Sequence, residues 1–219
     1  MESRLPAAVL WDMDGTLVDT EPLWMETEHA MAAKYGGEWT NEDAMQLVGN
    51  DLLDSGRYLK DRWGLSQSAE EVVEELLDGV VERLSSGEVP WRPGARELLA
   101  DLKTNGVRCA LVTMSYLKFA TPILEQLPTE SFHVIVTGEQ VDNGKPHPEP
   151  YETAAAALGV ATRDCVAIED SNTGATSAEA AGCTVLVIEN HVPVAQGPRR
   201  VFLDTLAGLT YATLPELLG

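Results

Sequence analysis

The sequence predicts an α/β protein, in which a parallel sheet carries a helical insertion after its first strand. After residue 94, short apolar runs alternate with helical patterns. Runs that are apolar throughout are typical of strands covered on both faces of a parallel sheet. Residues 22–86 differ, because their apolar positions recur at helical spacing and strand-like runs are nearly absent. A Pro/Gly-rich segment at 87–94 separates these two parts.

The first strand and the insertion come first along the chain. The run PAAVLWD at 6–12 predicts a buried strand that ends in an aspartate. In the insertion, Ser68 and Glu71 have the spacing of a capping box at a helix start. The helices predicted in the insertion lie at roughly 22–35, 41–48, 51–63 and 68–86.

The rest of the chain completes the sheet. Pro122 is expected to kink the helix that contains it. Strands are predicted at 107–113, 132–137, 165–169 and 184–188 and, more weakly, at 201–203. Helices are predicted at 94–105, 116–127, 148–158 and 173–181. These elements predict one domain made of residues 1–18 and 92–219, and a helical domain at 19–91 that its two connections allow to move as a lid.

Composition narrows the classes of partner. The 219 residues carry a formal net charge of −20, and 44 % of them are hydrophobic, which suits a packed interior. We expect no nucleic-acid partner and no anionic membrane partner, because both are repelled by such a charge. No apolar run approaches the ~20 residues of a membrane span. The N-terminus does not resemble a signal peptide, and the three cysteines lie in apolar runs, so we expect a cytoplasmic protein. We expect a monomer or a weak dimer.

Chemically active residues collect where the predicted strands end. Ligands of open α/β sheets bind beyond the carboxyl ends of the strands. Clustered carboxylates there repel one another unless a cation joins them. The segments that follow the predicted strands are Asp12-Met13-Asp14-Gly15-Thr16, Thr113-Met114-Ser115, Gly144-Lys145-Pro146 and Glu169-Asp170-Ser171.

Each of these segments also has a simpler explanation. Asp-x-Asp-Gly is found in calcium loops, but here the glycine position of such a loop falls on Leu17 and its glutamate position on Leu23. Asp-Gly alone is common in turns, and the hydroxyls of Thr113 and Ser115 suit helix N-caps. Lys145 alone is typical of a solvated lysine. The four segments together, in this order and at strand ends, favour a shared active site.

The four segments in order resemble the haloacid dehalogenase superfamily of phosphotransferases. DMDGT begins the series, TMS follows about 100 residues later at the end of the next predicted strand, and GKPHPEPY and IEDSNTG complete it. The resemblance covers most of the chain and implies a Rossmann-like core with a small helical cap. DMDGTLVDTEPLW and GKPxPxxY are similar to the branch that contains sugar-phosphate phosphatases, phosphoglycolate phosphatases and β-phosphoglucomutase.

The resemblance implies roles for the acidic residues. Asp12 is the expected nucleophile, since a carboxylate is ionised at neutral pH and its acyl phosphate is labile. Mg²⁺ is the implied cofactor, held by Asp12, by the backbone carbonyl of Asp14 and by Asp170, with Glu169 as a further candidate ligand. On an extended chain the Asp14 side chain points to the same side as that of Asp12, and a neighbouring negative charge favours its protonated form. By this resemblance, Asp14 is the expected general acid and base.

Three further residues are expected to bind the phosphoryl group. The Thr113 hydroxyl and the Met114 backbone N–H would donate hydrogen bonds to its oxygens. Lys145 would bring a positive charge to the transferring group. In a chain of charge −20, this lysine and the metal ion are the local attraction that an anionic substrate needs.

The reaction and the substrate are narrowed by differences within the superfamily. Asp14 argues against haloacid dehalogenases and phosphonatases, which lack that second acid. β-Phosphoglucomutases have a cap histidine where this chain has Trp24, so a phosphatase acting on a small phosphorylated metabolite, foremost a sugar phosphate, is favoured. A mutase and a catalytically inert binding module remain as alternatives.

The expected substrate contacts from the helical domain have alternatives of their own. Trp24 either stacks on a sugar ring or packs inside the helical domain. Glu21 either meets sugar hydroxyls or is solvated. The Gly49-Asn50 turn either reaches the active site or only separates two helices.

Overall fold

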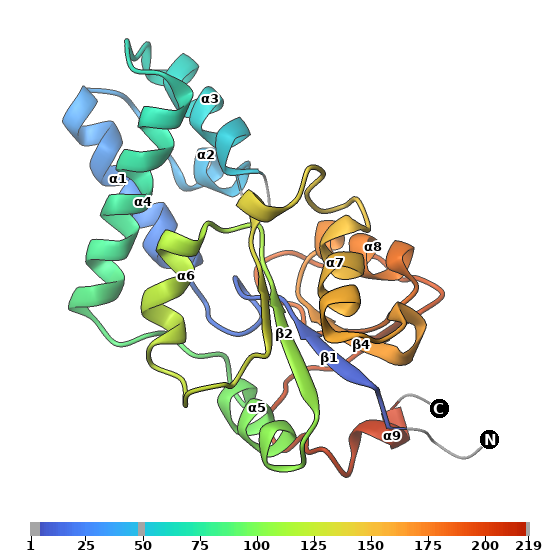
Figure 1. Ribbon diagram of the computed structural model, residues 1–219. Coiled ribbons are helices and arrows are strands. Elements are labelled where there is room, and N and C mark those ends of the chain that lie inside the picture. The colour runs from blue at the N-terminus through green and yellow to red at the C-terminus, as the bar shows by residue number, and fades with distance from the viewer. Residues whose placement is uncertain (1–4, 48–50, 218–219) are drawn as a thin grey trace. The chain divides into compact units, whose positions relative to one another are not determined.

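The computed structural model describes residues 5–47 and 51–217 (Figure 1). The strands are β1 (Ala8–Trp11), β2 (Arg108–Val112), β3 (Val134–Val136), β4 (Cys165–Glu169), β5 (Thr184–Val187) and β6 (Arg200–Phe202). The α-helices are α1 (Glu21–Tyr35), α2 (Asn41–Met45), α3 (Leu52–Trp63), α4 (Ala69–Ser86), α5 (Ala95–Thr104), α6 (Leu117–Leu124), α7 (Glu149–Leu158), α8 (Asn172–Ala181) and α9 (Leu214–Leu217). Two short 3-10 helices are η1 (Gly138–Gln140) and η2 (Thr162–Asp164).

The strands in the described part of the chain form a parallel sheet in the order β3-β2-β1-β4-β5-β6. β1 lies between β2 and β4, with Trp11 opposite Leu111 on one side and Ile168 on the other. The predicted α/β fold, with a helical insertion between β1 and β2, is confirmed. Because β1 is central and all its neighbours are parallel to it, the segment after Trp11 emerges between the ends of β2 and β4.

Local sequence signals explain several element ends. The Ser68 side chain accepts the Glu71 N–H, and the Glu71 carboxylate accepts the Ser68 N–H, so the predicted capping box begins α4. Pro122 lies inside α6, as expected from its position. Both 3-10 helices and α9 were not predicted, because segments this short have no periodic apolar pattern.

The described chain divides into two compact units. The first consists of the chain up to Asp19, of Pro90–Met114 and of the chain from Leu127 onward, and it contains the whole sheet. The second consists of Thr20–Val89 and Ser115–Gln126, so α6 belongs with α1–α4 of the insertion. Within the second unit α6 packs against α4, and the Phe119 ring meets the Trp24 ring edge to face with centroids 5.0 Å apart.

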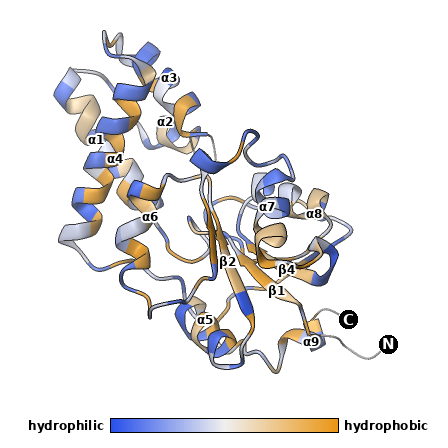
Figure 2. Cartoon of the chain, in the orientation of Figure 1, coloured by the Kyte–Doolittle hydropathy of each residue, from blue (hydrophilic) through white to orange (hydrophobic). Residues whose placement is uncertain are grey.

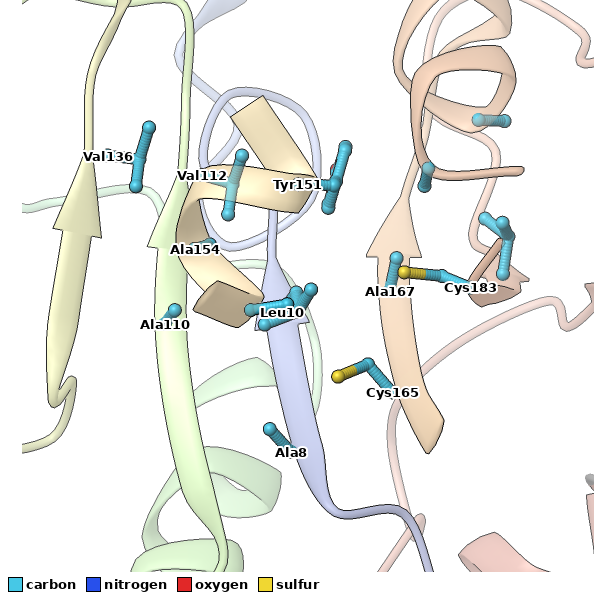
Figure 3. Packing of buried hydrophobic residues seen from close by; sticks show 14 of the residues in the cluster. Ala8, Leu10, Ala110, Val112, Val136, Tyr151, Ala154, Cys165, Ala167 and Cys183 are labelled. Atoms are coloured by element: carbon cyan, nitrogen blue, oxygen red, sulfur yellow. The ribbon is translucent and has the colours of Figure 1, made fainter. Parts of the chain in front are cut away.

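One part of the core of the sheet unit lies between the sheet and the helices α7 and α8. Helix α7 packs against β1, β2 and β3, and α8 packs against β4 and β5. Figure 3 shows alternate strand residues, among them Ala8 and Leu10, turned toward Ala154 and Tyr151 of α7. Small residues on the strands and on α7 allow the helix to approach the sheet closely.

The helical unit has a core of its own, rich in aromatic residues. Trp39 meets Trp63 and Tyr58 edge to face, with ring centroids 5.2 Å and 6.1 Å away. Figure 2 shows that α3 and α4 alternate between hydrophilic and hydrophobic residues along their length, whereas β1 is hydrophobic. Within residues 5–47 and 51–217, no helix has both the length and the apolar composition of a membrane span.

Candidate active site

Asp12 follows β1 directly and is 7 % exposed. Its backbone N–H donates to the Ile168 carbonyl oxygen at 3.1 Å, which continues the pairing of β1 with β4 by one residue. The carboxyl group is therefore fixed at the end of the central strand. Both neighbouring strand ends supply further polar groups beside it.

A tight turn follows at Asp14 and Gly15. The N–H groups of Leu17 and Val18 donate to the Met13 carbonyl oxygen at 2.9 and 3.1 Å, and the Gly15 N–H donates to the Val18 carbonyl oxygen at 2.7 Å. Gly15 has φ +82°, a conformation that L side chains rarely adopt. A Cβ atom on Gly15 would lie 1.9 Å from Oδ2 of Asp170. The glycine thus permits both the turn and the close approach of Asp170.

Thr113 follows β2 and joins this turn. Its hydroxyl donates to Oδ2 of Asp14 at 3.3 Å, and its N–H donates to the Val136 carbonyl oxygen at 2.9 Å. The residue is 1 % exposed. The hydroxyl of one strand end thus lies against the acid that follows the neighbouring strand.

Lys145 brings a buried positive charge to these acids. Its ammonium group donates to Oδ1 of Asp12 and Oε1 of Glu169, both at 2.7 Å, and to the Val112 carbonyl oxygen at 2.9 Å. Its side chain is only 5 % exposed. Burial alone would favour the neutral amine, but the two carboxylates outweigh it and raise the pKa of Lys145 above its usual value.

Burial is the largest influence on the pKa of Asp12. Burial and the charge of Glu169 raise the pKa of Asp12 to about 7, although Lys145 acts in the opposite direction and Asp14 adds a smaller increase. One lysine therefore does not offset the combined effect of burial and the neighbouring acids on the pKa of Asp12. Further positive charge would favour the ionised form of Asp12.

The acids fit a divalent cation. Carboxylate oxygens of Asp12, Glu169 and Asp170 lie within 4.8 Å of one another. Such an all-oxygen set is what Mg²⁺ prefers, with water completing the coordination. Of these three, Asp170 is partly exposed, whereas Asp12 and Glu169 are buried. These three residues thus could hold a divalent metal ion.

Glu169 is held on several sides. It is 0 % exposed, and its Oε1 accepts from the Tyr151 hydroxyl at 2.5 Å as well as from Lys145. Ser171 donates to Oε2 at 3.3 Å. A Cβ atom on Gly174 would lie 2.0 Å from Oε1, so a side chain at this position would displace the Glu169 carboxylate. Burial, followed by the charge of Glu169, raises the pKa of Tyr151 well above its usual value, so its hydroxyl keeps its proton.

Two supporting contacts were missed by sequence reasoning. Tyr151 was present in the GKPHPEPY motif but was given no role. The thioether sulfur of Met114 accepts the Lys145 N–H at 3.2 Å, whereas the sequence suggested only a role for the Met114 backbone. The position of Tyr151 after the lysine was the only signal for the first contact, and no sequence signal indicated the second.

The structure therefore brings together Asp12, Asp14, Thr113, Lys145, Glu169 and Asp170, while their catalytic and metal-binding roles stay predictions. Glu21 and Trp24 lie in α1 of the helical unit. Trp24 contacts Phe119 there, in accord with packing inside that unit. The predicted Gly49-Asn50 turn lies outside the described residues.

Two phosphatases of known name are similar to this chain in sequence. Hexitol phosphatase B of Escherichia coli (strain K12) is 33 % identical over 218 residues, covering 97 % of this chain and 96 % of that protein. The phosphorylated carbohydrates phosphatase of Thermotoga maritima is 34 % identical over 176 residues, covering 80 % of this chain and 81 % of that protein. Both relatives thus share most of their length with this chain.

A solved structure shares the fold. A mutant of CbbY from Rhodobacter sphaeroides, in complex with xylulose-(1,5)bisphosphate, superposes with a TM-score of 0.83 at 28 % identity, covering 94 % of this chain and 96 % of that one. Residues 9–188 match the family described as haloacid dehalogenase-like hydrolase. This match, the relatives and the convergence of the four segments at the strand ends show that the chain belongs to the haloacid dehalogenase-like hydrolases.

Proposed function

We propose that the protein is a magnesium-dependent phosphatase that hydrolyses a small phosphorylated metabolite, foremost a sugar phosphate. The observation that carries this proposal is the Lys145 ammonium group shared between Asp12 and Glu169, at 2.7 Å from each. It holds the Asp12 carboxylate, the proposed nucleophile, at the end of a central strand, beside a second acid and a candidate metal site. The relatives named as phosphatases of hexitols and of phosphorylated carbohydrates support the choice of substrate class.

The proposed reaction has two steps. In the first, Asp12 attacks phosphorus, the bond from phosphorus to the ester oxygen breaks, and Asp14 gives its proton to the leaving alcohol. In the second, water attacks the phosphorus of the aspartyl phosphate while Asp14 takes back a proton, and inorganic phosphate leaves. The contact between Asp14 and the Thr113 hydroxyl would hold the acid in place between the steps.

The remaining groups stabilise charge. Lys145 and the Thr113 hydroxyl would face the phosphoryl oxygens, together with the backbone N–H of Met114. A magnesium ion held by Asp12, Asp170 and the Asp14 carbonyl, with Glu169 as a direct or water-mediated ligand, would reduce the repulsion between the nucleophile and the anionic substrate. We further propose that the helical domain, residues 19–91 by sequence, acts as a cap, and that Glu21, Trp24, Gly49 and Asn50 contribute to substrate selection.

The first experiment compares two aspartate-to-asparagine variants. Asp12→Asn should lower phosphatase activity by more than about 10³-fold, because the amide cannot form the acyl phosphate. Asp61→Asn changes the same group on an exposed position of α3 and should keep wild-type activity. The activity of both variants is measured as release of inorganic phosphate. The substrates are p-nitrophenyl phosphate and a panel of sugar phosphates, each tested with magnesium and with EDTA.

The same assay separates the alternatives. A mutase would convert one sugar phosphate into its isomer and release little inorganic phosphate. An inert binding module would release none from any ester. Near-normal hydrolysis by Asp12→Asn would refute the covalent mechanism, and full activity in EDTA would refute the role of the metal ion.

A further inference from the structure

A single carboxylate oxygen of Glu169 accepts hydrogen bonds from two donors. Oε1 accepts from Lys145 Nζ at 2.7 Å and from the Tyr151 hydroxyl at 2.5 Å. The other oxygen accepts from the Ser171 hydroxyl at 3.3 Å. Because Glu169 is completely buried, these protein donors carry the stabilisation that water would otherwise give to its charge.

Tyr151 is placed to control this carboxylate. It lies in the first turn of α7 and is 0 % exposed. Figure 3 shows its side chain beyond Leu10, toward the carboxyl end of β1. The centre of its ring is 5.1 Å from Lys145 Nζ, within reach of a cation–π interaction. One side chain therefore contacts both members of the Lys145–Glu169 ion pair.

We propose that Tyr151 is a positioning residue that acts through Glu169 and keeps the Lys145 ammonium group shared with Asp12. The inference rests on the proposed phosphatase function for its kinetic consequence, but not for its structural one. The hydroxyl neutralises part of the Glu169 charge through a charge-assisted hydrogen bond. Without it, Glu169 attracts the ammonium group more strongly, and Lys145 moves away from Asp12 and from the phosphoryl group.

The helical unit contains a similar but more exposed arrangement. In the helical unit, Glu75 accepts from Lys34 Nζ at 2.8 Å and from the Tyr35 hydroxyl at 2.6 Å. The Lys34 ammonium group also lies 5.0 Å from the centre of the Tyr35 ring. Tyr35→Phe therefore deletes the same group from the same kind of triad and serves as the control for Tyr151→Phe.

The first test is kinetic. Tyr151→Phe should lower kcat by about 10- to 150-fold, the effect of one lost hydrogen bond to a charged group, with a change in KM below about threefold. Tyr35→Phe should change neither. In a Lys145→Ala background, Tyr151→Phe should have no further effect, because the group through which it acts is gone. Equal fractional losses in both backgrounds, or an unchanged kcat in Tyr151→Phe, would overturn the proposal.

The second test does not need activity. The ¹⁵Nζ signal of buried Lys145, assigned with Lys145→Ala, is recorded by NMR in wild type, in Tyr151→Phe and in Tyr35→Phe. The signal should shift in Tyr151→Phe alone. If the wild type hydrolyses no phosphate ester but the signal shifts as expected, the proposed function fails and the positioning role stands. An unshifted signal in Tyr151→Phe overturns the positioning role itself.

A second variant guards against a general packing defect. Replacing Tyr151 with 4-aminophenylalanine keeps the ring and a hydrogen-bond donor, so it should restore at least half of the kcat lost in Tyr151→Phe. A role confined to packing predicts a lower unfolding temperature with an unchanged kcat in both variants, and that result would also overturn the proposal.

Discussion

Gly15 is the residue at which backbone conformation and the acidic site depend on each other. Its φ of +82° closes the turn after Asp14, and its missing side chain leaves room for the Asp170 carboxylate. Gly64, at the end of α3, has a similar φ of +63°, but a Cβ atom there would meet nothing within 4 Å. A side chain at Gly64 would therefore cause backbone strain alone, whereas a side chain at Gly15 would cause backbone strain and a steric clash.

Alanine substitution at both glycines tests this separation. Gly64→Ala should cost about 1–2 kcal/mol of unfolding free energy, the strain of a left-handed residue. Gly15→Ala should cost more, and it should also reduce phosphatase activity, because the new methyl group displaces Asp170. Urea unfolding and steady-state kinetics measure the two effects. Equal stability losses with wild-type activity in Gly15→Ala would show that Asp170 does not need this close approach.

At the level of single residues, the sequence indicated the reactive groups better than the residues that hydrogen-bond to them. Asp12, Asp14, Lys145 and the Glu169-Asp170 pair stood out because charged groups at the ends of buried strands are costly without a partner. Tyr151 did not stand out, since a tyrosine in an apolar helix pattern is equally typical of core packing. Its hydroxyl gains a partner only because α7 packs on the sheet and brings it to Glu169 at the end of β4.

Helix α1 buries an acid inside the helical unit. Glu28 is 4 % exposed, and its carboxylate accepts from the Trp39 indole N–H at 3.1 Å. Burial raises the pKa of Glu28 to about 7, although the hydrogen bond from Trp39 acts in the opposite direction. The folded protein therefore holds this proton at pH values at which the unfolded chain has released it.

This difference predicts a pH dependence of stability. Between pH 4.5 and about 7 the unfolded state binds fewer protons at Glu28 than the folded state, so the free energy of unfolding falls as pH rises. The loss at pH 8 should approach about 3 kcal/mol. Glu28→Gln should remove this loss of unfolding free energy. The variant should therefore gain stability relative to the wild type at pH 8 more than at pH 5.

Thermal unfolding of the wild type, Glu28→Gln and Glu26→Gln from pH 5 to 8 measures this difference. Glu26 is the matched control, because it is exposed on the same helix. Parallel pH profiles of the wild type and Glu28→Gln would contradict the prediction.

At the level of elements, local patterns predicted whether a segment is a helix or a strand better than they predicted the residues at which it ends. The strand at 165–169 and the capping box at Ser68 were predicted as observed, because the apolar run of the one and the Ser/Glu spacing of the other are visible in neighbouring residues. Helix α2 ends at Met45 rather than at residue 48, since the end of a short helix depends on tertiary contacts. The order of the strands and the grouping of α6 with the insertion required the structure.

For the whole molecule, charge is the dominant property. The net charge of −20 opposes the approach of an anionic substrate, and the acids around Asp12 add to this repulsion locally. Lys145 is already committed to Asp12 and Glu169. A divalent cation is therefore expected to stabilise the folded state as well as to support the reaction.

Magnesium should raise the unfolding temperature of the protein. If the dissociation constant is about 1 mM, 10 mM magnesium adds about 1.4 kcal/mol, or roughly 3–5 °C for a chain of this size. Sodium chloride of equal ionic strength is the control, because salt alone screens the self-repulsion of the chain. Asp170→Asn should lose most of the magnesium-specific shift. Equal shifts with both salts in the wild type would argue against a specific site.

The sequence by itself determined the α/β fold, the insertion after the first strand and the segments that bear the reactive groups. These follow from apolar periodicity and from charges at strand ends, which are properties of neighbouring residues. Only the tertiary structure decided that Lys145 divides its charge between Asp12 and Glu169, that Tyr151 donates to Glu169, and that Gly174 leaves room for the Glu169 carboxylate. Those contacts join residues more than a hundred positions apart in some cases, and their distances depend on how helices pack on the sheet, which no local pattern encodes.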